Sequence, residues 1–448
     1  MKTRLAFLLG LGILAAAPSP ALANGRFPES NHIFFSAKDP NEVLLRTTFG
    51  LLVSRDRGAT WSWVCEKSIG TSGNEDPMYA VTPDGTTIAT TFQGIAISSD
   101  RLCSWSLATG GVEKTVFVDL SQSVPDPKTV MTFASSYDKQ DDAGNILFKS
   151  QLFETKDEGK SFTAIGQPFD PSLLGETVDL APSDPQRIYV SVVKNPGSAP
   201  TPQTFLLVST DHGTSFTPYE VPLVTGEKAL FIAGVDPKNA DRVYVRTSNA
   251  TDKPSRLLYS DDGGKSFKTA LTSKGALLGF AISADGTKVW AGGPSDGVLM
   301  ANATDMAFQP KSATQVQCLA TGTDGLWACS NEKTGFVAGL STDDGATFQT
   351  KLHFCDIKGA LDCPKETPTG SLCPAAWVQQ SEQLGCTQPA GDGGADGGDA
   401  GTIGPGAQPG GGGGGSGCSC RTTPASPYGA AIAALGAAVA FLRRERRN

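Results

Sequence analysis

Six carboxyl side chains stand on or just before predicted innermost β-strands, where they could do acid–base chemistry. They are Glu75, Asp76, Glu113, Asp119, Glu176 and Asp179. Glycoside hydrolysis generally needs two facing carboxyl groups, one acting as the acid and one as the base or nucleophile. Nothing in the sequence marks two of the six as a pair, so an acidic rim is the plainer interpretation.

Other catalytic and metal-binding chemistry finds little support in the sequence. The chain has three histidines, His32, His212 and His353, and no Ser–His–Asp arrangement is visible around them. A zinc site is the competing interpretation of the cysteines, but the body of the chain lacks the CxxC or Cys/His pairs that zinc prefers. The sequence therefore predicts no metal site and no cofactor.

Ten cysteines fall into two groups, because Cys418 and Cys420 stand apart in "GCSC". The eight in the body are Cys65, Cys103, Cys318, Cys329, Cys355, Cys363, Cys373 and Cys386. An even number suits a disulfide framework in an exported protein, although spacing does not fix the connectivity. Our hypothesis pairs neighbours: Cys65 with Cys103, Cys318 with Cys329, and two bridges within 355–386.

The first 23 residues are typical of a secretory signal peptide. Lys2 and Arg4 precede an apolar run from Leu5 to Ala17, and Ala21-Leu22-Ala23 forms a small-residue cleavage site. The apolar run is too short to span a membrane. A buried N-terminal helix is the alternative. We expect export and a mature chain that begins at Asn24.

One phrase recurs along the chain: Ser/Thr-x-Asp-x-Gly-x-Ser/Thr-aromatic. Five good copies end at an aromatic residue, a degraded copy has Leu102 where Gly belongs, and a remnant ends at Phe308. The Asp position of the phrase is occupied by Asp56, Asp100, Asp157, Asp211, Asp262 and Asp343. Repeated identical turns seldom each carry chemistry, so a structural role is favoured.

A second marker alternates with the first. An apolar run ends in Asp-Pro or Asp-Gly at Asp39, Asp84, Asp126, Asp184, Asp236, Asp285 and Asp324. Each Asp turn is followed by a β-rich run, a third strand and one copy of the phrase. Such a four-stranded unit cannot bury both faces alone, but seven stacked around an axis can. The sequence thus predicts an all-β, seven-bladed β-propeller of antiparallel blades.

These phrases resemble the Asp-box (BNR) repeats of sialidase-like and sortilin-like β-propellers, over residues 24–352. The resemblance implies that each box lies on the hairpin between the third and fourth strands. It also implies an Asp that binds turn amides, a Gly at positive φ and an aromatic side chain packed between sheets. A calcium site is the alternative for "DDG", but it needs several oxygen ligands and one box supplies one inward-pointing Asp.

A sialidase-like glycoside hydrolase is the alternative function. That family carries an arginine triad, a Tyr–Glu nucleophile pair and an acidic catalyst. Here "GRFPES" (Gly25–Ser30) lacks the order of the family's Phe-Arg-Ile-Pro-like motif, and Tyr79, Tyr189 and Tyr244 look like strand residues. The resemblance therefore leaves enzymatic activity open.

Three adjacent units carry connections between the second and third strands that are about ten residues longer than the others. They are Ser135–Asn145, Lys194–Thr204 and Ser248–Ser255. Long loops without structure of their own tend to be functional, whereas solvated decoration is the alternative. The predicted ligand contacts on this top face are Tyr137, Asp138, Asp141, Asp142, Asn145, Lys194, Asn195, Asn249 and Lys253.

The end of the chain changes character three times. We expect residues 353–388 to form a short Cys-rich segment that is held by disulfides and packed near blade 7. Residues 389–417 are rich in Gly, Ala, Asp and Pro, which is typical of a flexible linker. Residues 418–448 hold the Gly-Cys pair, an apolar helix from Tyr428 to Leu442 and four arginines. This run is marginal for a membrane span, and its arginines would stay cytoplasmic.

The tail, residues 418–448, resembles the MYXO-CTERM sorting signal of myxobacterial surface proteins. In that family a membrane protease cleaves near the Cys, and the mature protein reaches the cell surface with an apparent lipid anchor. Cys418 or Cys420 would be the processed residue. A plain C-terminal membrane anchor is the alternative, with the same topology.

Charge and organisation together limit the function. A net charge of −8 argues against nucleic-acid binding. We expect an exported, surface-anchored, monomeric propeller that binds an extracellular glycan or protein through its top face without catalysis. A sialidase-like glycosidase and a surface scaffold are the alternatives. The other expected partners are a C-terminal sorting protease and the membrane, through the tail.

Overall fold

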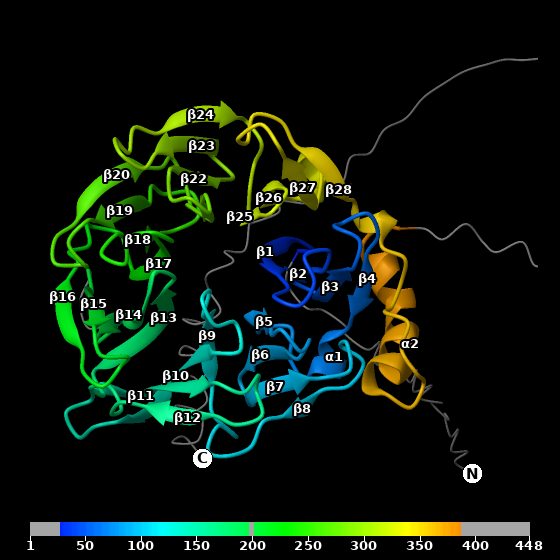
Figure 1. Ribbon diagram of the computed structural model, residues 1–448, viewed down its shortest axis with the longest axis horizontal. Helices are drawn as coiled ribbons and strands as arrows, with labels where there is room; N and C mark the ends of the chain where they lie inside the picture. The colour runs from blue at the N-terminus through cyan, green and yellow to red at the C-terminus, as the bar shows by residue number, and fades with distance from the viewer. Residues whose placement is uncertain (1–26, 197–200, 387–448) are drawn as a thin grey trace, which may run out of the picture.

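Seven four-stranded antiparallel sheets form a ring in the computed structural model, which describes residues 27–196 and 201–386. The strands of each sheet pair in chain order, so each blade is a meander. The first strand lies nearest the ring centre and the fourth lies at the periphery (Figure 1). The predicted seven-bladed propeller is confirmed.

The blades follow one another along the chain. Blade 1 is β1 (Ser30–Phe35), β2 (Val43–Thr47), β3 (Gly50–Ser54) and β4 (Ser62–Val64). Blade 2 is β5 (Tyr79–Val81), β6 (Thr87–Thr91), β7 (Gly94–Ser98) and β8 (Ser106–Leu107). Blade 3 is β9 (Phe117–Gln122), β10 (Val130–Gln140), β11 (Ile146–Thr155) and β12 (Thr163–Ile165). Blade 4 is β13 (Leu173–Ala181), β14 (Asp184–Lys194), β15 (Gln203–Ser209) and β16 (Thr217–Glu220).

The remaining blades and helices complete the described chain. Blade 5 is β17 (Ala229–Val235), β18 (Val243–Ser248), β19 (Arg256–Ser260) and β20 (Lys268–Thr272). Blade 6 is β21 (Gly279–Ile282), β22 (Lys288–Gly293), β23 (Gly297–Asn302) and β24 (Gln309–Ser312). Blade 7 is β25 (Cys318–Gly322), β26 (Gly325–Cys329), β27 (Ala338–Ser341) and β28 (Gln349–Leu352). The helices are α1 (Glu66–Ile69), η1 (Glu332–Thr334), η2 (Phe354–Asp356) and α2 (Pro368–Gln383).

The meander gives the ring two different faces. The Asp turns between first and second strands and the repeated turns between third and fourth strands lie on one face, which we name the turn face. The connections between second and third strands and the linkers between blades lie on the opposite face, which we name the linker face. The linker face corresponds to the predicted top face.

The repeated turn is a closed set of hydrogen bonds. In blade 1, Ser54 Oγ donates to Asp56 Oδ1 (2.7 Å) and accepts from the backbone N–H of Gly58 (2.8 Å). The backbone N–H and hydroxyl of Thr60 donate to the two Asp56 oxygens at 2.8 and 2.6 Å. Blades 3, 4, 5 and 7 repeat this pattern. Because the glycine has φ of +79°, a side chain there would be strained.

Adjacent blades are held together by buried apolar side chains and by hydrogen bonds between their inner strands. Asp119 Oδ2 and Ser121 Oγ of β9 accept from the backbone N–H groups of Val178 (2.8 Å) and Leu180 (3.0 Å) of β13. Thr177 Oγ1 of β13 accepts from Ile232 N of β17 at 2.9 Å. These contacts satisfy amide groups that the inner edge of each sheet leaves unpaired.

The ring closes between blades 7 and 1 without sharing a strand. All four strands of blade 7 come from the C-terminal end of the propeller. Ser30 Oγ at the start of β1 donates to Val337 O in blade 7 at 2.6 Å. Ile33 and Leu45 of blade 1 share one buried cluster with Trp327 of blade 7 and Phe354 beyond it. Closure therefore depends on side-chain packing and on the segment that follows.

Residues 353–386, which we name the strap, cross from blade 7 over the outer edges of blades 1 and 2. Trp63 of β4 donates its backbone N–H to Gly359 O and accepts from Leu361 N, both at 2.8 Å, so the strap adds a short parallel bridge to blade 1. Helix α2 then lies along the outside of the ring, against β4 and α1 (Figure 1). Its N-cap, Thr367, accepts from Gly370 N at 3.2 Å.

The eight body cysteines form four disulfides, and two of the proposed pairings are wrong. The observed pairs are Cys65–Cys373, Cys103–Cys363, Cys318–Cys329 and Cys355–Cys386. The Cys318–Cys329 pair and one bridge within 355–386, Cys355–Cys386, agree with the hypothesis, whereas Cys65–Cys103 and the second bridge within 355–386 do not form. Cys65 and Cys103 instead bind the strap, which passes both blades in space although it lies far away in sequence. The strap is thus stapled to blades 1 and 2 rather than packed on blade 7 alone.

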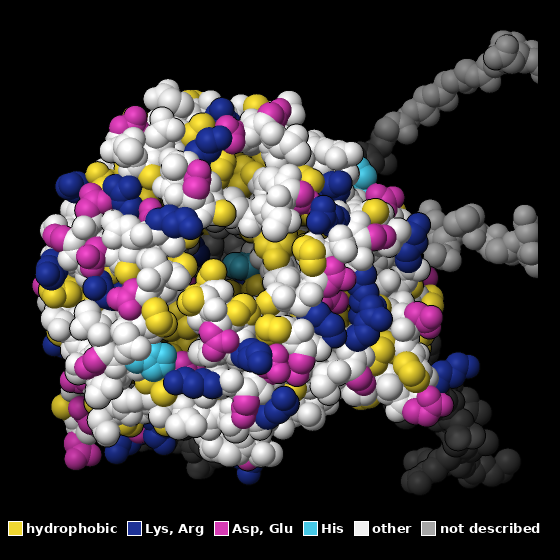
Figure 2. All heavy atoms as spheres, viewed as in Figure 1, with side chains coloured by type: hydrophobic (Ala, Val, Ile, Leu, Met, Phe, Trp, Pro, Cys, Tyr) yellow, Lys and Arg dark blue, Asp and Glu magenta, His cyan; other side chains and the backbone are white. Residues whose placement is uncertain are grey.

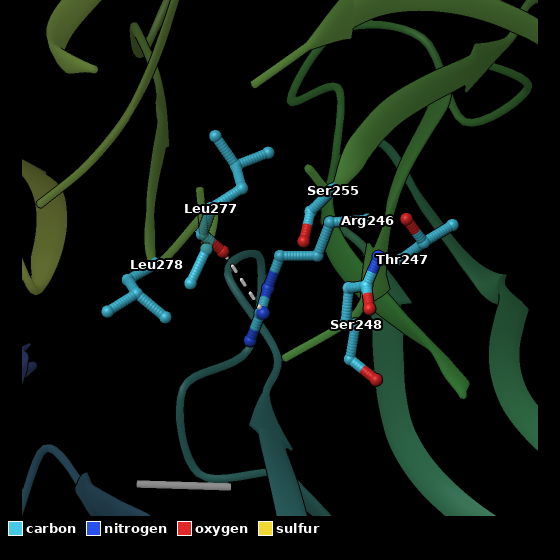
Figure 3. A pocket seen from close by; sticks show the side chains of 8 residues that line it. Arg246, Thr247, Ser248, Ser255, Leu277 and Leu278 are labelled. Carbon is cyan, nitrogen blue, oxygen red and sulfur yellow. Dashed lines mark hydrogen bonds between the residues drawn. The ribbon is translucent and has the colours of Figure 1, made fainter. Parts of the chain in front are cut away.

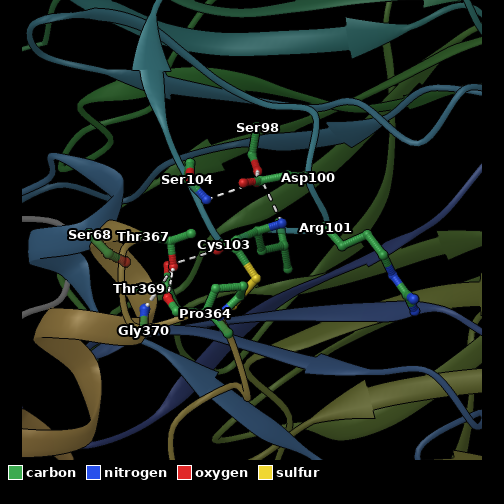
Figure 4. The surroundings of a disulfide bond; sticks show 12 residues. Ser68, Ser98, Asp100, Arg101, Cys103, Ser104, Pro364, Thr367, Thr369 and Gly370 are labelled. Atoms are coloured by element: carbon green, nitrogen blue, oxygen red, sulfur yellow. Dashed lines mark hydrogen bonds between the residues drawn. A yellow bond between two sulfur atoms is a disulfide. The ribbon is translucent and has the colours of Figure 1, made fainter.

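The degraded repeat in blade 2 is where the strap docks. Leu102 stands in the glycine position at φ +74° and is buried. Thr369 donates its hydroxyl to Leu102 O (2.7 Å) and its backbone N–H to Cys103 O (3.0 Å), beside the Cys103–Cys363 disulfide (Figure 4).

The predicted signal peptide, Gly-rich linker and C-terminal tail, with Cys418, Cys420 and the apolar helix, lie outside the described residues. Among residues 27–196 and 201–386, no helix is both long and apolar enough to cross a membrane.

Candidate functional site

The linker face carries the nine side chains predicted to contact a ligand, on three successive blades. Tyr137 and Asp138 lie in the outer part of β10, whereas Lys194 is the last residue of β14 and Asn195 follows it. Asp141, Asp142 and Asn145 form the tip between β10 and β11, and Asn249 and Lys253 lie between β18 and β19. The connections that carry these side chains come from blades 3, 4 and 5, which are neighbours in the ring.

The connection in blade 3 is a hairpin rather than the predicted loop without structure. Its strands stay paired as far as Gln140 and Ile146. Asp141 Oδ1 accepts from the backbone N–H groups of Ala143 (3.0 Å) and Asn145 (2.7 Å), so these polar side chains shape the tip. The long connection in blade 4 is also partly strand, because β14 continues to Lys194 and β15 begins at Gln203.

Among residues 27–196 and 201–386, three aromatic side chains are strongly exposed, and all three lie on the linker face. Phe27 precedes β1 and is 61% exposed, Phe92 lies in the two-residue turn between β6 and β7 and is 41% exposed, and Tyr137 is 43% exposed. Lys333 of η1 places its Nζ over the Phe27 ring, 5.8 Å from the centroid. Exposed rings offer flat apolar surface that a ligand can cover.

The connection in blade 5 is held by its own side chains. Asn249 donates from Nδ2 to Pro254 O (2.9 Å), while its Oδ1 accepts from Ala250 N (2.8 Å). Lys253 pairs with Asp252 at 3.2 Å. Asn249 is therefore mainly a loop-shaping residue, whereas Lys253 is exposed.

A shallow recess lies beside this connection, at the junction of blades 5 and 6. Arg246 of β18 extends into it and donates from Nη1 to Leu277 O at 3.2 Å (Figure 3). The same guanidinium lies over the ring of Phe231 on β17, with its Cζ 4.9 Å from the centroid. The recess thus connects the linker face with the inner strands.

The centre of the ring is hollow, with hydrophobic side chains around the opening (Figure 2). Asp119 of β9 and Glu176 and Asp179 of β13 come from neighbouring inner strands. Ser121 Oγ donates to Asp179 Oδ1 at 3.3 Å. Among the described residues, Glu176 has no hydrogen-bond or ion-pair partner. Asp119 and Asp179 are close enough for their charges to interact, whereas no charge interaction joins Glu176 to either.

Burial dominates the electrostatics of these three carboxyl groups. It raises the pKa of Asp119 to about 8, against the Val178 amide that lowers it, and the charge of Asp179 adds to the rise. Burial alone raises the pKa of Glu176 to about 8. Burial also raises the pKa of Asp179 to about 7, although the Ser121 hydroxyl lowers it. Groups of this kind can carry a proton at neutral pH and donate it.

Positive charge approaches the same region from two blades. Burial, together with the charges of Arg46 and Arg246, lowers the pKa of His32 on β1 to about 3. Arg46 donates to Asn31 Oδ1 (2.7 Å) and to Asp76 O (3.0 Å). His32 is thus neutral at physiological pH, and both arginines already have contacts within the protein.

The other acidic candidates are structural. Glu75 accepts from the backbone N–H groups of Ser72 (3.0 Å) and Phe92 (2.8 Å). Glu113 accepts from the backbone N–H groups of Gly110 and Gly111. Asp76 accepts from Asn31 Nδ2 at 3.3 Å. These carboxylates order linker-face loops around the hollow and do not form a facing pair.

The aspartates of the repeated turns lack the arrangement of a metal site. Their oxygens are taken by local donors, and these hydrogen bonds lower the pKa of Asp211, Asp262 and Asp343 to about 2. Across the described residues, no group of three or more His, Cys, Asp or Glu side chains could hold a metal ion. In these turns, each aspartate stabilises its own loop.

No protein-family model matches the sequence, and no curated protein matches it. Solved structures match at low identity. Hydrazine synthase from Kuenenia stuttgartiensis is 10% identical, with 75% of this chain and 100% of that chain covered and a TM-score of 0.48. An ancestral GH74 enzyme is 11% identical over 72% of this chain, with a TM-score of 0.44, and the match spans only 38% of the enzyme. YCF48 bound to D1 peptide is 14% identical, with 67% and 88% covered and a TM-score of 0.41. Similarity at this level assigns neither a ligand nor an activity.

Sequence reasoning missed Phe27, Phe92 and the arginines near the hollow. Phe92 had no reliable signal, because Phe49 in the matching two-residue turn of blade 1 is buried. Arg46 lies directly opposite His32 in the β1–β2 register, whereas Arg246 comes from β18 of blade 5, which the sequence does not place near His32.

Proposed function

We propose that this chain is an exported, surface-anchored propeller that binds an extracellular ligand on its linker face without catalysing a reaction. The observation that carries the proposal is the concentration of all three strongly exposed aromatic side chains on that face. The longest strand connections of the ring lie on the same face. No such aromatic surface occurs on the turn face of the described chain.

The chemistry of the surface favours a glycan over other ligands. The rings of Phe27, Phe92 and Tyr137 can cover the apolar face of a sugar ring. Asp142, Lys194 and Lys253 are exposed beside the connections and can exchange hydrogen bonds with its hydroxyl groups. A protein ligand is the other possibility within this proposal, and the experiment below separates the two.

The proposed location follows from the ends of the chain and from its cysteines. Four disulfides suit an oxidising compartment. The proposed signal peptide (1–23) gives export, and the proposed MYXO-CTERM-type tail (418–448) gives processing by a sorting protease and attachment to the surface. The repeated turns are proposed to be Asp boxes, and the protein is proposed to be a monomer.

The test is a glycan-array screen of the purified, oxidised protein, followed by affinity measurements on any bound glycan. We expect Tyr137→Ala and Phe92→Ala each to weaken binding roughly tenfold, since each removes a stacking contact worth about 1 to 1.5 kcal/mol. Leu107→Ala is the matched control, because Leu107 is equally exposed but lies on the outermost strand of blade 2. An equal loss in the Leu107 variant would contradict the proposal, and silence on the array would favour a protein ligand or a scaffold.

A sialidase-like glycoside hydrolase is the second candidate, favoured by the three carboxyl groups with raised pKa in the hollow. Glu176 and Asp179 are half-buried and border the hollow, as an acid catalyst would. Product analysis of each bound glycan decides between the two functions. Cleavage that is lost in both Glu176→Gln and Asp179→Asn would establish the hydrolase, whereas binding without turnover supports the receptor.

A further inference from the structure

A cavity of about 470 Å³ opens on the turn face between blades 6 and 7. Its walls are the Asp turns of both blades, the start of β22 and the repeated turn of blade 7. It therefore lies on the opposite side of the ring from the linker-face site. A volume in this range is that of a small-ligand pocket.

One long side chain that bridges another junction has a small counterpart here. In the Asp turn of blade 1, Lys38 stands before Asp39 and donates its Nζ to Asp84 O of blade 2 at 2.8 Å. In blade 6 the residue before Asp285 is Ala284. Arg187 of blade 4 bridges to Asp241 of blade 5 at 2.7 Å, and Lys288 of blade 6 bridges to Asp344 of blade 7 at the same distance, so the difference at this junction is the small side chain at position 284.

Blade 6 also differs from the other blades at its junction with blade 5 and in its own repeated turn. Tyr189 of blade 4 donates its hydroxyl to Ala240 O in the Asp turn of blade 5 (2.6 Å). The matching hydroxyl of Tyr244 in blade 5 is buried without a hydrogen-bond partner among the described residues. The turn it would reach, residues 283–287, is shorter than residues 236–242 of blade 5. The repeated turn of blade 6 has also lost its Ser and Asp, to Ala301 and Ala303.

The lining offers both hydrogen-bond acceptors and a donor. Asp285 Oδ1 accepts from Ser283 Oγ (2.6 Å) and from the backbone N–H and hydroxyl of Thr287 (3.0 and 2.8 Å). Asp324 Oδ1 accepts from Trp327 Nε1 at 2.8 Å. The Oδ2 atoms of both aspartates have no partner among the described residues, so each is open to a donor from a ligand.

Lys288 supplies the donor. Its Nζ lies 2.9 and 2.7 Å from the two carboxylate oxygens of Asp344, which leaves its third N–H for another acceptor. Thr342 adds an exposed hydroxyl group, while Trp290 and Leu326 form the apolar part of the wall. This mixture suits a ligand whose groups both donate and accept.

We propose that the cavity between blades 6 and 7 binds a neutral saccharide of one or two rings. Sugar hydroxyl groups can donate to the open oxygens of Asp285 and Asp324 and accept from Lys288. The carboxylates would repel an anionic ligand, because the nearby cation Lys288 is already paired with Asp344. The charge of Lys288 would in turn repel a polyamine. The proposal is independent of the linker-face site, because the two sites share no residue.

The test is calorimetric titration of the full mature protein with cellobiose, lactose, xylobiose and chitobiose. Binding of at least one disaccharide is expected. Asp324→Asn keeps the acceptor for Trp327 but turns the open oxygen into a donor, so affinity should fall roughly tenfold. Ala284→Lys restores the side chain that closes the junction in blade 1, and it should abolish binding without lowering the melting temperature.

Two controls keep this result specific. Asp39→Asn alters the same turn position in blade 1, and Tyr137→Ala alters the linker face; both should leave disaccharide affinity unchanged. The proposal is overturned if none of the four disaccharides binds, or if binding survives Ala284→Lys in a folded protein. Loss of binding in Tyr137→Ala alone would instead assign the disaccharide to the linker face.

Discussion

Aspartates and glutamates of this protein have two opposite electrostatic environments. In the repeated turns, local N–H and hydroxyl donors stabilise the charged carboxylate and lower its pKa. Beside the hollow, burial destabilises the charge and raises the pKa of Asp119, Glu176 and Asp179. The first group stabilises loops when ionised, whereas the second favours the protonated form in the folded state.

Glu176 makes this contrast measurable. A carboxyl group with a raised pKa in the folded state contributes most to stability below its unfolded pKa. This contribution is lost as the pH rises through the folded-state pKa, which is about 8 for Glu176. Glu176→Gln removes that loss, so the variant should gain stability over the wild type between pH 5 and pH 8, by on the order of 1 kcal/mol. Chemical denaturation at both pH values checks it. A difference that does not change with pH would contradict the assigned environment.

The roles of single residues could be predicted only where repetition revealed them. The Asp, Gly and aromatic positions of the repeated turn were recognisable because five blades share them. Exposure was not predictable in the same way. Phe49 and Phe92 both lie in two-residue turns after the second strand, yet Phe49 is buried against Phe354 of the strap, with ring centroids 5.5 Å apart, and Phe92 is exposed. A contact from a distant segment decides the difference.

At the scale of elements, the hairpin of β10 and β11 is anchored at its base and open at its tip. Ser135 Oγ accepts from Gly175 N of blade 4 (2.9 Å) and lies 3.1 Å from Ser150 Oγ. Both hydroxyl groups are buried, so these bonds join blades 3 and 4. The proposed ligand-contact segment therefore begins after Ser135, whose hydroxyl group has a structural contact, and not at Ser135 as the sequence suggested.

Shortening the tip tests that boundary. Replacing residues 138–147 with Asn-Gly leaves Tyr137 opposite Phe148, where a two-residue turn can join the strands. We expect the melting temperature to stay within about 2 °C of the wild type, because no buried contact is removed. Affinity for a linker-face ligand should fall several-fold, as measured by titration. Unchanged affinity would confine the site to the aromatic residues, and deletion from Ser135 serves as the destabilised comparison.

Strand order and blade number could be derived from the sequence because two markers alternate seven times. The length of β10 could not, since its outer half is polar and resembles a loop. Strand pairing there is supported by the backbone ladder, which continues to Gln140 without an apolar pattern. Propensity alone does not distinguish such an extension from a loop.

At the scale of the whole molecule, the strap helps to hold the ring closed, because blades 7 and 1 share no strand. Two disulfides join it to blades 1 and 2 across sequence separations of 308 and 260 residues. The sequence could not reveal this pairing, because cysteines that are neighbours in the chain are not neighbours around the ring. Opening the strap would leave blades 7 and 1 joined by packing and a few hydrogen bonds.

Removing the strap disulfides should weaken the entire ring. We expect a variant with Cys65, Cys103, Cys363 and Cys373 all replaced by Ala to lose about 4 to 6 kcal/mol of unfolding free energy, since both loops are very long. In the control variant, Cys318 and Cys329 are replaced, which removes a disulfide that spans 11 residues. This variant should lose about 3 kcal/mol of unfolding free energy or less. Denaturant titration compares the two. An equal loss in both variants would contradict a closing role for the strap.

The central claim, that a ligand binds on the linker face, is tested most directly by hydrogen–deuterium exchange of the full protein with and without a glycan from the array. The account predicts new protection at residues 92–93, 135–145 and 248–255, with the repeated turns unchanged. Protection confined to residues 283–287 and 321–325 would place the ligand between blades 6 and 7 and contradict the linker-face assignment.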